Sequence, residues 1–68
     1  IQQRAYQRLN QLNAAVSLND LRAPSSNRLE ALVGNRSGQH SIRINQQWRP
    51  CFGWLGNDAT EVEIVDYH

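Results

Sequence analysis

The chain has 68 residues and a formal net charge of +1, which allows one small domain over residues 1–68. Its longest purely apolar stretches have three residues, far below the roughly 20 that a membrane-spanning helix needs, and no signal-peptide pattern opens it. The single cysteine, Cys51, has no partner for an internal disulfide, and no Cys/His spacing resembles a zinc site. We therefore expect a cytoplasmic protein without a membrane span, a structural metal or a cofactor.

The charge is unevenly distributed along the chain. All seven basic residues are arginines within residues 1–57, which hold two acidic residues, whereas residues 58–68 hold four acidic residues and no basic one. A net charge near zero argues against a strong nucleic-acid binder, but arginine offers a planar fork that matches a phosphate group. A GC-rich genome or the removal of lysines by engineering explains the same composition equally well.

The first expected element is a helix over residues 1–14. Its apolar residues recur at steps of three and four, which places them on one stripe of a helix. These residues are Ile1, Ala5, Leu9, Leu12 and Val16. No N-cap residue precedes them and the sequence does not begin with methionine, so we expect the protein to extend upstream.

A second, short helix is expected over residues 18–22. Ser17 and Asp20 have the spacing of a capping box, with an acidic side chain where Glu or Gln is commoner. Pro24 disfavours helical geometry at the residue before it, and turn-forming residues follow. The second helix should therefore have little more than one turn.

Four strands are expected in the rest of the chain, because apolar and polar residues alternate there and turn-forming residues separate the runs. Their ranges are 28–33, 39–45, 48–55 and 59–66. The short connections favour an antiparallel meander. The predicted fold class is α+β, with two N-terminal helices packed on one face of an antiparallel β-sheet.

The alternation also assigns side chains to the two faces of this sheet. In the third strand, one face carries Trp48, Pro50, Phe52 and Trp54. The opposite face carries Arg49, Cys51, Gly53 and Leu55. In the last strand, the residues expected to point inward are Val62 and Ile64.

Several short motifs follow one another in a distinctive order. They are residues 13–15 with 17–21, 28–32, 41–45, 48–49 and the terminal Val65-Asp66-Tyr67-His68. Together they resemble the HigB-type toxins of the RelE/ParE toxin superfamily, also described as plasmid maintenance or host-inhibition-of-growth killer proteins. The resemblance covers essentially the whole chain. Because such toxins usually carry a further N-terminal segment that forms a first strand, it implies a RelE-like fold, N-terminally truncated, with the first strand missing.

The resemblance implies the toxin of a type II toxin-antitoxin system, a ribosome-dependent mRNA endoribonuclease that inhibits translation. Its partners would be the ribosome, mRNA and a HigA-type antitoxin with a helix-turn-helix domain, and operator DNA would be contacted only through the antitoxin. Such enzymes cleave RNA without a metal ion, by attack of the ribose 2′-OH on the adjacent phosphorus. This reaction needs a base, a cation for the phosphorane charge and an acid for the 5′-oxygen.

The resemblance also assigns catalytic roles to four residues. Arg49 matches the sheet arginine that would stabilise the phosphorane through paired N–H donors. Tyr67 and His68 match the terminal residues used for base stacking and proton transfer, and Asp66 could orient the imidazole. Without the resemblance, the arginine would be interpreted as half of a surface ion pair with the last strand, and the terminal residues as a frayed end.

Other polar residues have both a functional and a structural interpretation. Arg43 and Arg36 are the candidates for RNA contact. Arg4 and Arg8 lie one helical turn apart and could face ribosomal RNA, although a solvated helix face is the default. His40 is expected to be packed or solvated rather than catalytic, and Cys51 is expected to pack without reacting.

Departures from the family pattern bear on activity. Val33 and Ser37 stand where similar toxins commonly carry basic residues, and Glu30 stands where several carry histidine and where a carboxylate would repel phosphate. Pro50 stands where similar toxins carry a branched apolar residue, and Gly53 where they usually carry a long polar side chain, often Arg; both changes should loosen the sheet beside the candidate arginine.

Three functions therefore stay open. The first is a working ribosome-dependent endonuclease. The second is a catalytically attenuated protein of the same fold that mainly binds its antitoxin. The third, inhibition of DNA gyrase as in the ParE branch, is disfavoured because that branch does not usually end in Asp-Tyr-His.

Overall fold

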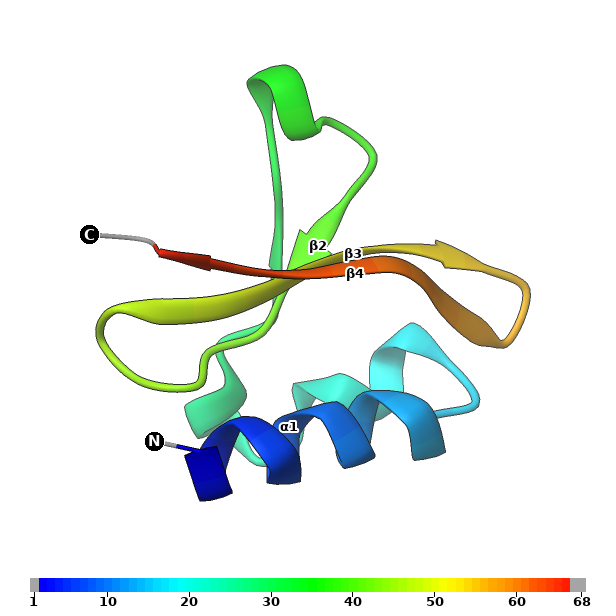
Figure 1. Cartoon of the computed structure of the whole chain (residues 1–68). Coiled ribbons are helices and arrows are strands. Elements are labelled where there is room, and N and C mark those ends of the chain that lie inside the picture. Colours follow the sequence, from blue (N-terminus) through cyan, green and yellow to red (C-terminus); the bar gives the residue numbers. More distant parts are fainter. Residues whose placement is uncertain (1, 67–68) are drawn as a thin grey trace.

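A computed structural model describes residues 2–66, in which a helix packs under a four-stranded antiparallel sheet (Figure 1). The helical elements are α1 (Gln2–Ala14) and the 3-10 helices η1 (Leu18–Arg22), η2 (Ser25–Asn27) and η3 (Gly34–Arg36). The strands are β1 (Glu30–Ala31), β2 (His40–Ser41), β3 (Trp48–Leu55) and β4 (Asp58–Asp66). The predicted α+β class is confirmed.

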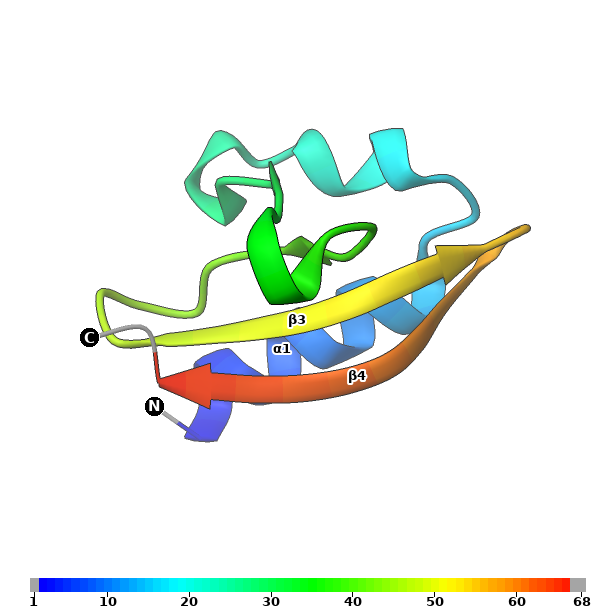
Figure 2. The same ribbon diagram turned by 90° about the horizontal axis from the view of Figure 1, so that it is seen from above.

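The sheet is a meander whose spatial order, β1-β2-β3-β4, follows the chain. β3 and β4 pair from Trp48 opposite Asp66 to Leu55 opposite Asp58, and the two long strands curve together across α1 (Figure 2). β1 and β2 have two residues each, and the segment between them, which contains η3, rises from the sheet on the side away from α1 (Figure 1).

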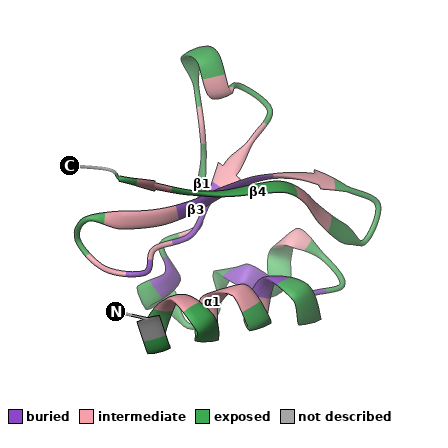
Figure 3. Cartoon of the chain, viewed as in Figure 1, coloured by how far each residue is buried: buried purple, intermediate pink, exposed green. Residues whose placement is uncertain are grey.

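The hydrophobic core lies between α1 and the sheet, where the buried segments of both meet (Figure 3). Its buried members are Leu12, Ala15, Leu21, Ile42 and Phe52. The predicted apolar stripe of the first helix supplies Leu12, with Leu9 packed beside it. Each large side chain buried in this way contributes about 1.5–3 kcal/mol relative to exposure.

The second helix has the predicted bounds but is a 3-10 helix, η1. The carboxylate of Asp20 accepts hydrogen bonds from the backbone N–H groups of Val16 (3.0 Å) and Ser17 (3.2 Å). This contact satisfies donors that the start of a helix otherwise leaves free. Pro24 follows in extended conformation, which ends the element as expected.

The expected strands over 28–33 and 39–45 are wrong in length. Arg28 adopts a left-handed conformation (φ 48°) at the end of η2, which delays β1, and η3 begins at Gly34. Beyond β2, the side-chain oxygen of Asn45 accepts hydrogen bonds from the N–H groups of Gln47 (2.8 Å) and Trp48 (2.9 Å). Such Asx turns compete with strand pairing, so local turn chemistry shortens both strands.

Val62 and Ile64, which were expected to point inward, are each 43% exposed. Ile64 pairs with Pro50, which is buried, so it lies on the face that carries the core. However, β4 is the edge of the sheet in the described chain, whereas the core centres on β2 and β3. The alternation therefore predicted the face of Ile64 but not its burial.

An irregularity separates the two halves of the β3–β4 pair. Cys51 pairs with Glu63 and Gly53 with Thr60, so Phe52 faces two residues of β4. One of these two, Glu61, has a positive φ of 50°. This is a β-bulge, a feature that bends a strand and increases its twist.

Phe52→Ala should destabilise the domain by about 3–5 kcal/mol, because it removes the largest fully buried side chain and leaves a cavity. Urea unfolding followed by circular dichroism measures this change. Val33→Ala is the matched control, since Val33 is 85% exposed and its truncation should change stability by no more than about 0.5 kcal/mol. Equal effects of the two substitutions would contradict the packing described here.

Candidate active site on the outer face of the sheet

The face of the sheet opposite α1 carries Arg49, whose guanidinium is held by two neighbours. Its Nη1 lies 3.2 Å from Glu30 Oε1 on β1 and donates a hydrogen bond to the hydroxyl of Ser41 on β2 (3.3 Å). Strand pairing places Ser41 of β2 opposite Glu30 of β1 and opposite Cys51 of β3. The pairing of the three strands therefore brings Glu30, Ser41 and the part of β3 that carries Arg49 together. The Arg49 side chain is only 11% exposed and the Glu30 side chain 48%. The predicted sheet arginine is therefore a positioned cation at the border of solvent.

Glu30 lies in the candidate site. The sequence predicts that its carboxylate repels phosphate, which stays a prediction, and the structure pairs this carboxylate with Arg49, the cation that would bind phosphate. Any anion approaching Arg49 must therefore compete with Glu30. The register of β1 and β2, which places a small serine between the two charged residues, was not evident from the sequence.

Arg36 lies on η3 and is also paired. Its Nη2 lies 3.2 Å from Glu63 Oε1 on β4, and its Nη1 donates a hydrogen bond to the side-chain carbonyl of Gln39 (3.1 Å). These contacts tie the raised segment between β1 and β2 to the edge strand. In the structure, Arg36 therefore holds this segment against β4. Its contact with RNA stays a prediction.

Arg43 lies near Arg49 because both side chains line one hollow. Its backbone carbonyl accepts a hydrogen bond from Arg8 Nε (3.0 Å), and its N–H donates to the carbonyl of Asn27. Its side chain lines a hollow of about 340 Å³ to which Arg28 and Arg49 also contribute. Two of the predicted site residues, Arg43 and Arg49, are thus brought to one hollow, and Arg28 joins them without having been singled out from the sequence.

The C-terminal candidates are only partly described. Asp66 ends β4 opposite Trp48, and its Oδ2 accepts a hydrogen bond from Gln47 Nε2 (3.2 Å). The preceding residue, Val65, pairs with Arg49. The end of β4 therefore lies beside the part of β3 that carries Arg49. Tyr67 and His68 lie outside the described residues, and their roles stay predictions.

The residues expected to pack do so. The ring of His40 stacks near that of Phe52, with centroids 6.2 Å apart and planes inclined by 30°. Cys51 is fully buried. Burial raises the pKa of its thiol above the ordinary value of 9.0 and outweighs the lowering by Arg36 and Arg49, while Glu63 adds a smaller shift in the upward direction. The thiol is therefore protonated near neutral pH and is a poor nucleophile.

The substituted strand positions differ in their consequences. Pro50 is buried, and its carbonyl accepts a hydrogen bond from the N–H of Ile42 (3.2 Å), so β3 keeps its pairing to the preceding segment there. A Cβ added at Gly53 would lie 2.6 Å from Thr60 Oγ1. A long side chain at position 53 would therefore require Thr60 to move.

The raised pKa of Cys51 predicts a dependence of stability on pH. The unfolded thiol ionises around 9.0 and the folded thiol only at higher pH, so above 9.0 the unfolded state binds fewer protons. The free energy of unfolding contributed by this group is fully present below pH 9.0 and is lost as pH rises through the folded-state pKa. The slope cannot exceed about 1.4 kcal/mol per pH unit for one group.

Urea unfolding between pH 8 and 10 measures this effect. Cys51→Ala is the comparison, because it lacks the thiol and keeps every other titrating group. The stability of the parent should fall more steeply with pH than that of the variant. Parallel curves would show that burial does not shift the thiol.

The described residues show neither a metal cluster nor a membrane helix. Within residues 2–66, no group of three or more His, Cys, Asp or Glu side chains is arranged to hold a metal ion. In the same part of the chain, no helix is both long and apolar enough to cross a bilayer.

Comparison with known proteins connects this geometry to a family. Residues 1–68 match the family described as RelE-like toxin of type II toxin-antitoxin system HigB. The chain is 44% identical over 59 residues to Toxin HigB-1 of Vibrio cholerae, covering 87% of this chain and 62% of that protein. It is also 32% identical over 57 residues to an uncharacterized protein of Haemophilus influenzae, covering 84% of this chain and 56% of that protein.

The chain thus spans about three fifths of the length of these relatives. The family match over all 68 residues and the 44% sequence identity to a HigB toxin agree with the α+β architecture and with the resemblance noted from the motifs. The chain belongs to the HigB-like family of RelE-like toxins of type II toxin-antitoxin systems.

Proposed function

We propose that this protein is a ribosome-dependent mRNA endoribonuclease, the toxin of a type II toxin-antitoxin system acting in the cytoplasm. The observation that carries the proposal is the placement of Arg49, a cation 11% exposed and held by two side chains beside an arginine-lined hollow. Family membership supports a toxin of a type II toxin-antitoxin system, the resemblance noted from the motifs implies the reaction class, and the site offers a positioned group that suits this reaction.

The proposed reaction is an internal transesterification. The 2′-oxygen of the ribose bonds to the adjacent phosphorus, the bond to the 5′-oxygen breaks, and the products carry a 2′,3′-cyclic phosphate and a 5′-hydroxyl. Negative charge grows on the nonbridging oxygens, where the guanidinium of Arg49 would donate two N–H bonds. The phosphate would replace the carboxylate of Glu30, whose half-exposed side chain is free to turn toward water.

Proton transfer is assigned to the C-terminal residues. His68 would exchange protons with the 2′- or 5′-oxygen, since an imidazole titrates near neutral pH. Tyr67 would stack on a base, and Asp66 would orient the imidazole. What supports this assignment is the course of β4, which ends beside the strand position of Arg49.

Arg49→Ala should lower cleavage by about 10²- to 10³-fold, which corresponds to about 3–4 kcal/mol of lost transition-state stabilisation. Primer extension that maps mRNA 5′ ends, with and without translation, measures cleavage. Arg22→Ala is the control, because it removes the same charge from an exposed position on η1. Unchanged cleavage by the Arg49 variant would overturn the proposed site.

A second candidate function is an attenuated toxin that mainly binds its antitoxin. The observation that favours it is the Glu30–Arg49 ion pair, because a carboxylate already occupies the cation needed for catalysis. Val33, which is neutral and 85% exposed, adds to this argument, because similar toxins commonly carry a basic residue at this position. Under this function the arginine surface would serve recognition rather than chemistry.

Antitoxin binding should depend on salt. A HigA-type helix-turn-helix antitoxin with an acidic segment would be steered toward the arginine-bearing surface, and mobile ions would screen that attraction. Calorimetric titrations with the co-encoded antitoxin should show weaker binding at 0.5 M than at 0.05 M salt. Equal affinity at both concentrations would indicate an apolar interface instead.

A further inference from the structure

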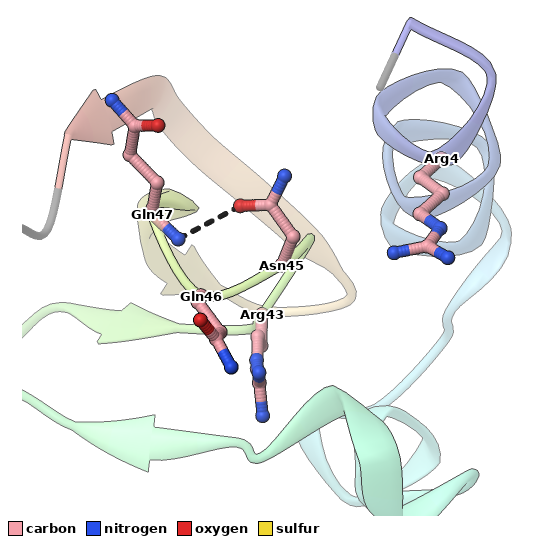
Figure 4. Close-up of a pocket in the computed structure, with 5 residues that line it drawn as sticks. All are labelled: Arg4, Arg43, Asn45, Gln46 and Gln47. Carbon is pink, nitrogen blue, oxygen red and sulfur yellow. Dashed lines mark hydrogen bonds between the residues drawn. The ribbon is translucent and has the colours of Figure 1, made fainter.

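A hollow of about 480 Å³ lies between α1 and the segment that connects β2 to β3 (Figure 4). It is lined by Arg4, Arg43, Asn45, Gln46 and Gln47. Figure 4 shows Arg4 projecting from α1, while the other four side chains come from the connecting segment, with Asn45 lying between Gln47 and Arg4. The volume falls within the range of small-molecule and nucleotide pockets.

This hollow continues into the candidate active site. Arg43, Asn45 and Gln46 also line the 340 Å³ hollow that contains Arg49, so the two share one wall. A third hollow, of about 350 Å³, adds Arg8 beside Arg4 and Arg43. We call these joined hollows the arginine furrow, defined by Arg4, Arg8, Arg28, Arg43 and Arg49. No acidic residue of the described chain is among the residues that line it.

The charge of the arginine furrow is largely unneutralised. In the described chain, the guanidinium groups of Arg4, Arg28 and Arg43 make neither an ion pair nor a hydrogen bond, in contrast to that of Arg36. Several unpaired cations around one concave surface repel one another and focus a positive potential there. Such a surface is suited to an extended anion.

The walls of the arginine furrow are held in place. Arg28 keeps a positive φ of 48°, which is unfavourable for a residue with a side chain, while its N–H donates to the carbonyl of Ser25 (3.1 Å). On the other wall, Asn45 accepts hydrogen bonds from Gln47 and Trp48, and the side chain of Gln47 donates to Asp66. The backbone of both walls, with the side chains of Asn45 and Gln47, is therefore positioned before any ligand arrives.

We propose that the arginine furrow binds the sugar–phosphate backbone of the substrate RNA, with Arg4 and Arg43 holding a phosphate away from the one presented to Arg49. This inference rests on the proposed endoribonuclease function. The amides of Gln46 and Asn45 suit RNA, because the Gln46 amide can both donate to and accept from ribose hydroxyls and base edges, while the Asn45 amide offers its N–H donors. The carboxylate side chains of an acidic peptide, in contrast, can only accept hydrogen bonds.

The test measures binding of a single-stranded 2′-O-methyl RNA oligonucleotide of nine nucleotides, whose blocked 2′-oxygens prevent cleavage, by fluorescence anisotropy over a salt series. Arg4→Gln and Arg43→Gln should each weaken binding several-fold at low salt. Each should also reduce the slope of log affinity against log salt by about 0.7, as expected for the loss of one phosphate contact to a single strand. Arg22→Gln, which lines none of these hollows, should change neither quantity.

The outcomes separate the possible occupants. Unchanged slopes in both variants, with circular dichroism showing an intact fold, would overturn the proposal. Binding of poly-glutamate that both variants weaken, together with unaffected RNA binding, would also overturn it and assign the arginine furrow to an acidic protein segment. If a trinucleotide binds with the same affinity as the nonamer, and Arg4→Gln does not weaken its binding, the proposed second phosphate site at Arg4 and Arg43 would be overturned.

The proposed function can fail separately. If the parent does not cleave mRNA on translating ribosomes but the slopes still change in the two variants, the endoribonuclease proposal is wrong and RNA binding by the arginine furrow stands. If Arg49→Ala abolishes cleavage while the slopes do not change, the endoribonuclease stands and the arginine furrow does not hold its substrate.

Discussion

The packing of Phe52 against the helical layer is the contact on which the arrangement of the sheet depends. Phe52 is fully buried on the central strand β3, together with Ile42 and Leu21. Because side chains alternate along a strand, this burial directs Arg49 and Cys51 to the other face. The candidate site is therefore a consequence of the core: a change in the register of β3 would exchange the two faces and remove the cation from the site.

The outer face is held together more weakly than the core. β1 and β2 contribute only two residues each; the segment between them is tied to β4 by the Arg36–Glu63 ion pair, and β1 is tied to β3 by the Glu30–Arg49 ion pair. Solvent-exposed ion pairs typically contribute less than about 1 kcal/mol each, so they define geometry more than stability. Local opening should begin in this segment, because regions with few buried apolar contacts unfold at the lowest free energy. This is compatible with a site where an anion displaces Glu30.

Catalysis and antitoxin recognition would place opposite demands on the same arginines. RNA cleavage needs a cation that is positioned yet available, whereas a protein that only binds an acidic partner can keep its arginines in any well-solvated arrangement. The low exposure and fixed partners of Arg49 suit the first demand. The guanidinium groups of Arg4, Arg28 and Arg43, which have no partner among residues 2–66, suit either demand. The structure thus separates one constrained arginine from a surrounding surface of less constrained ones.

Sequence patterns by themselves determined the fold class, the first helix, both long strands and the sheet face on which Arg49 lies. Helical and strand periodicities are local properties that a single chain segment displays. The lengths of β1 and β2, the bulge at Phe52 and the exposure of Val62 were decided by turn chemistry and by which elements cover each strand.

The partners of the site residues also came only from the tertiary structure. The pairing of Arg49 with Glu30 crosses an intervening strand, and the hollow shared by Arg4 and Arg43 joins α1 to the segment before β3. Residues so far apart in the chain meet only after the sheet has set its register and the helix has packed beneath it. Charge type and strand alternation could therefore predict that Arg49 faces outward, but not which carboxylate would meet it.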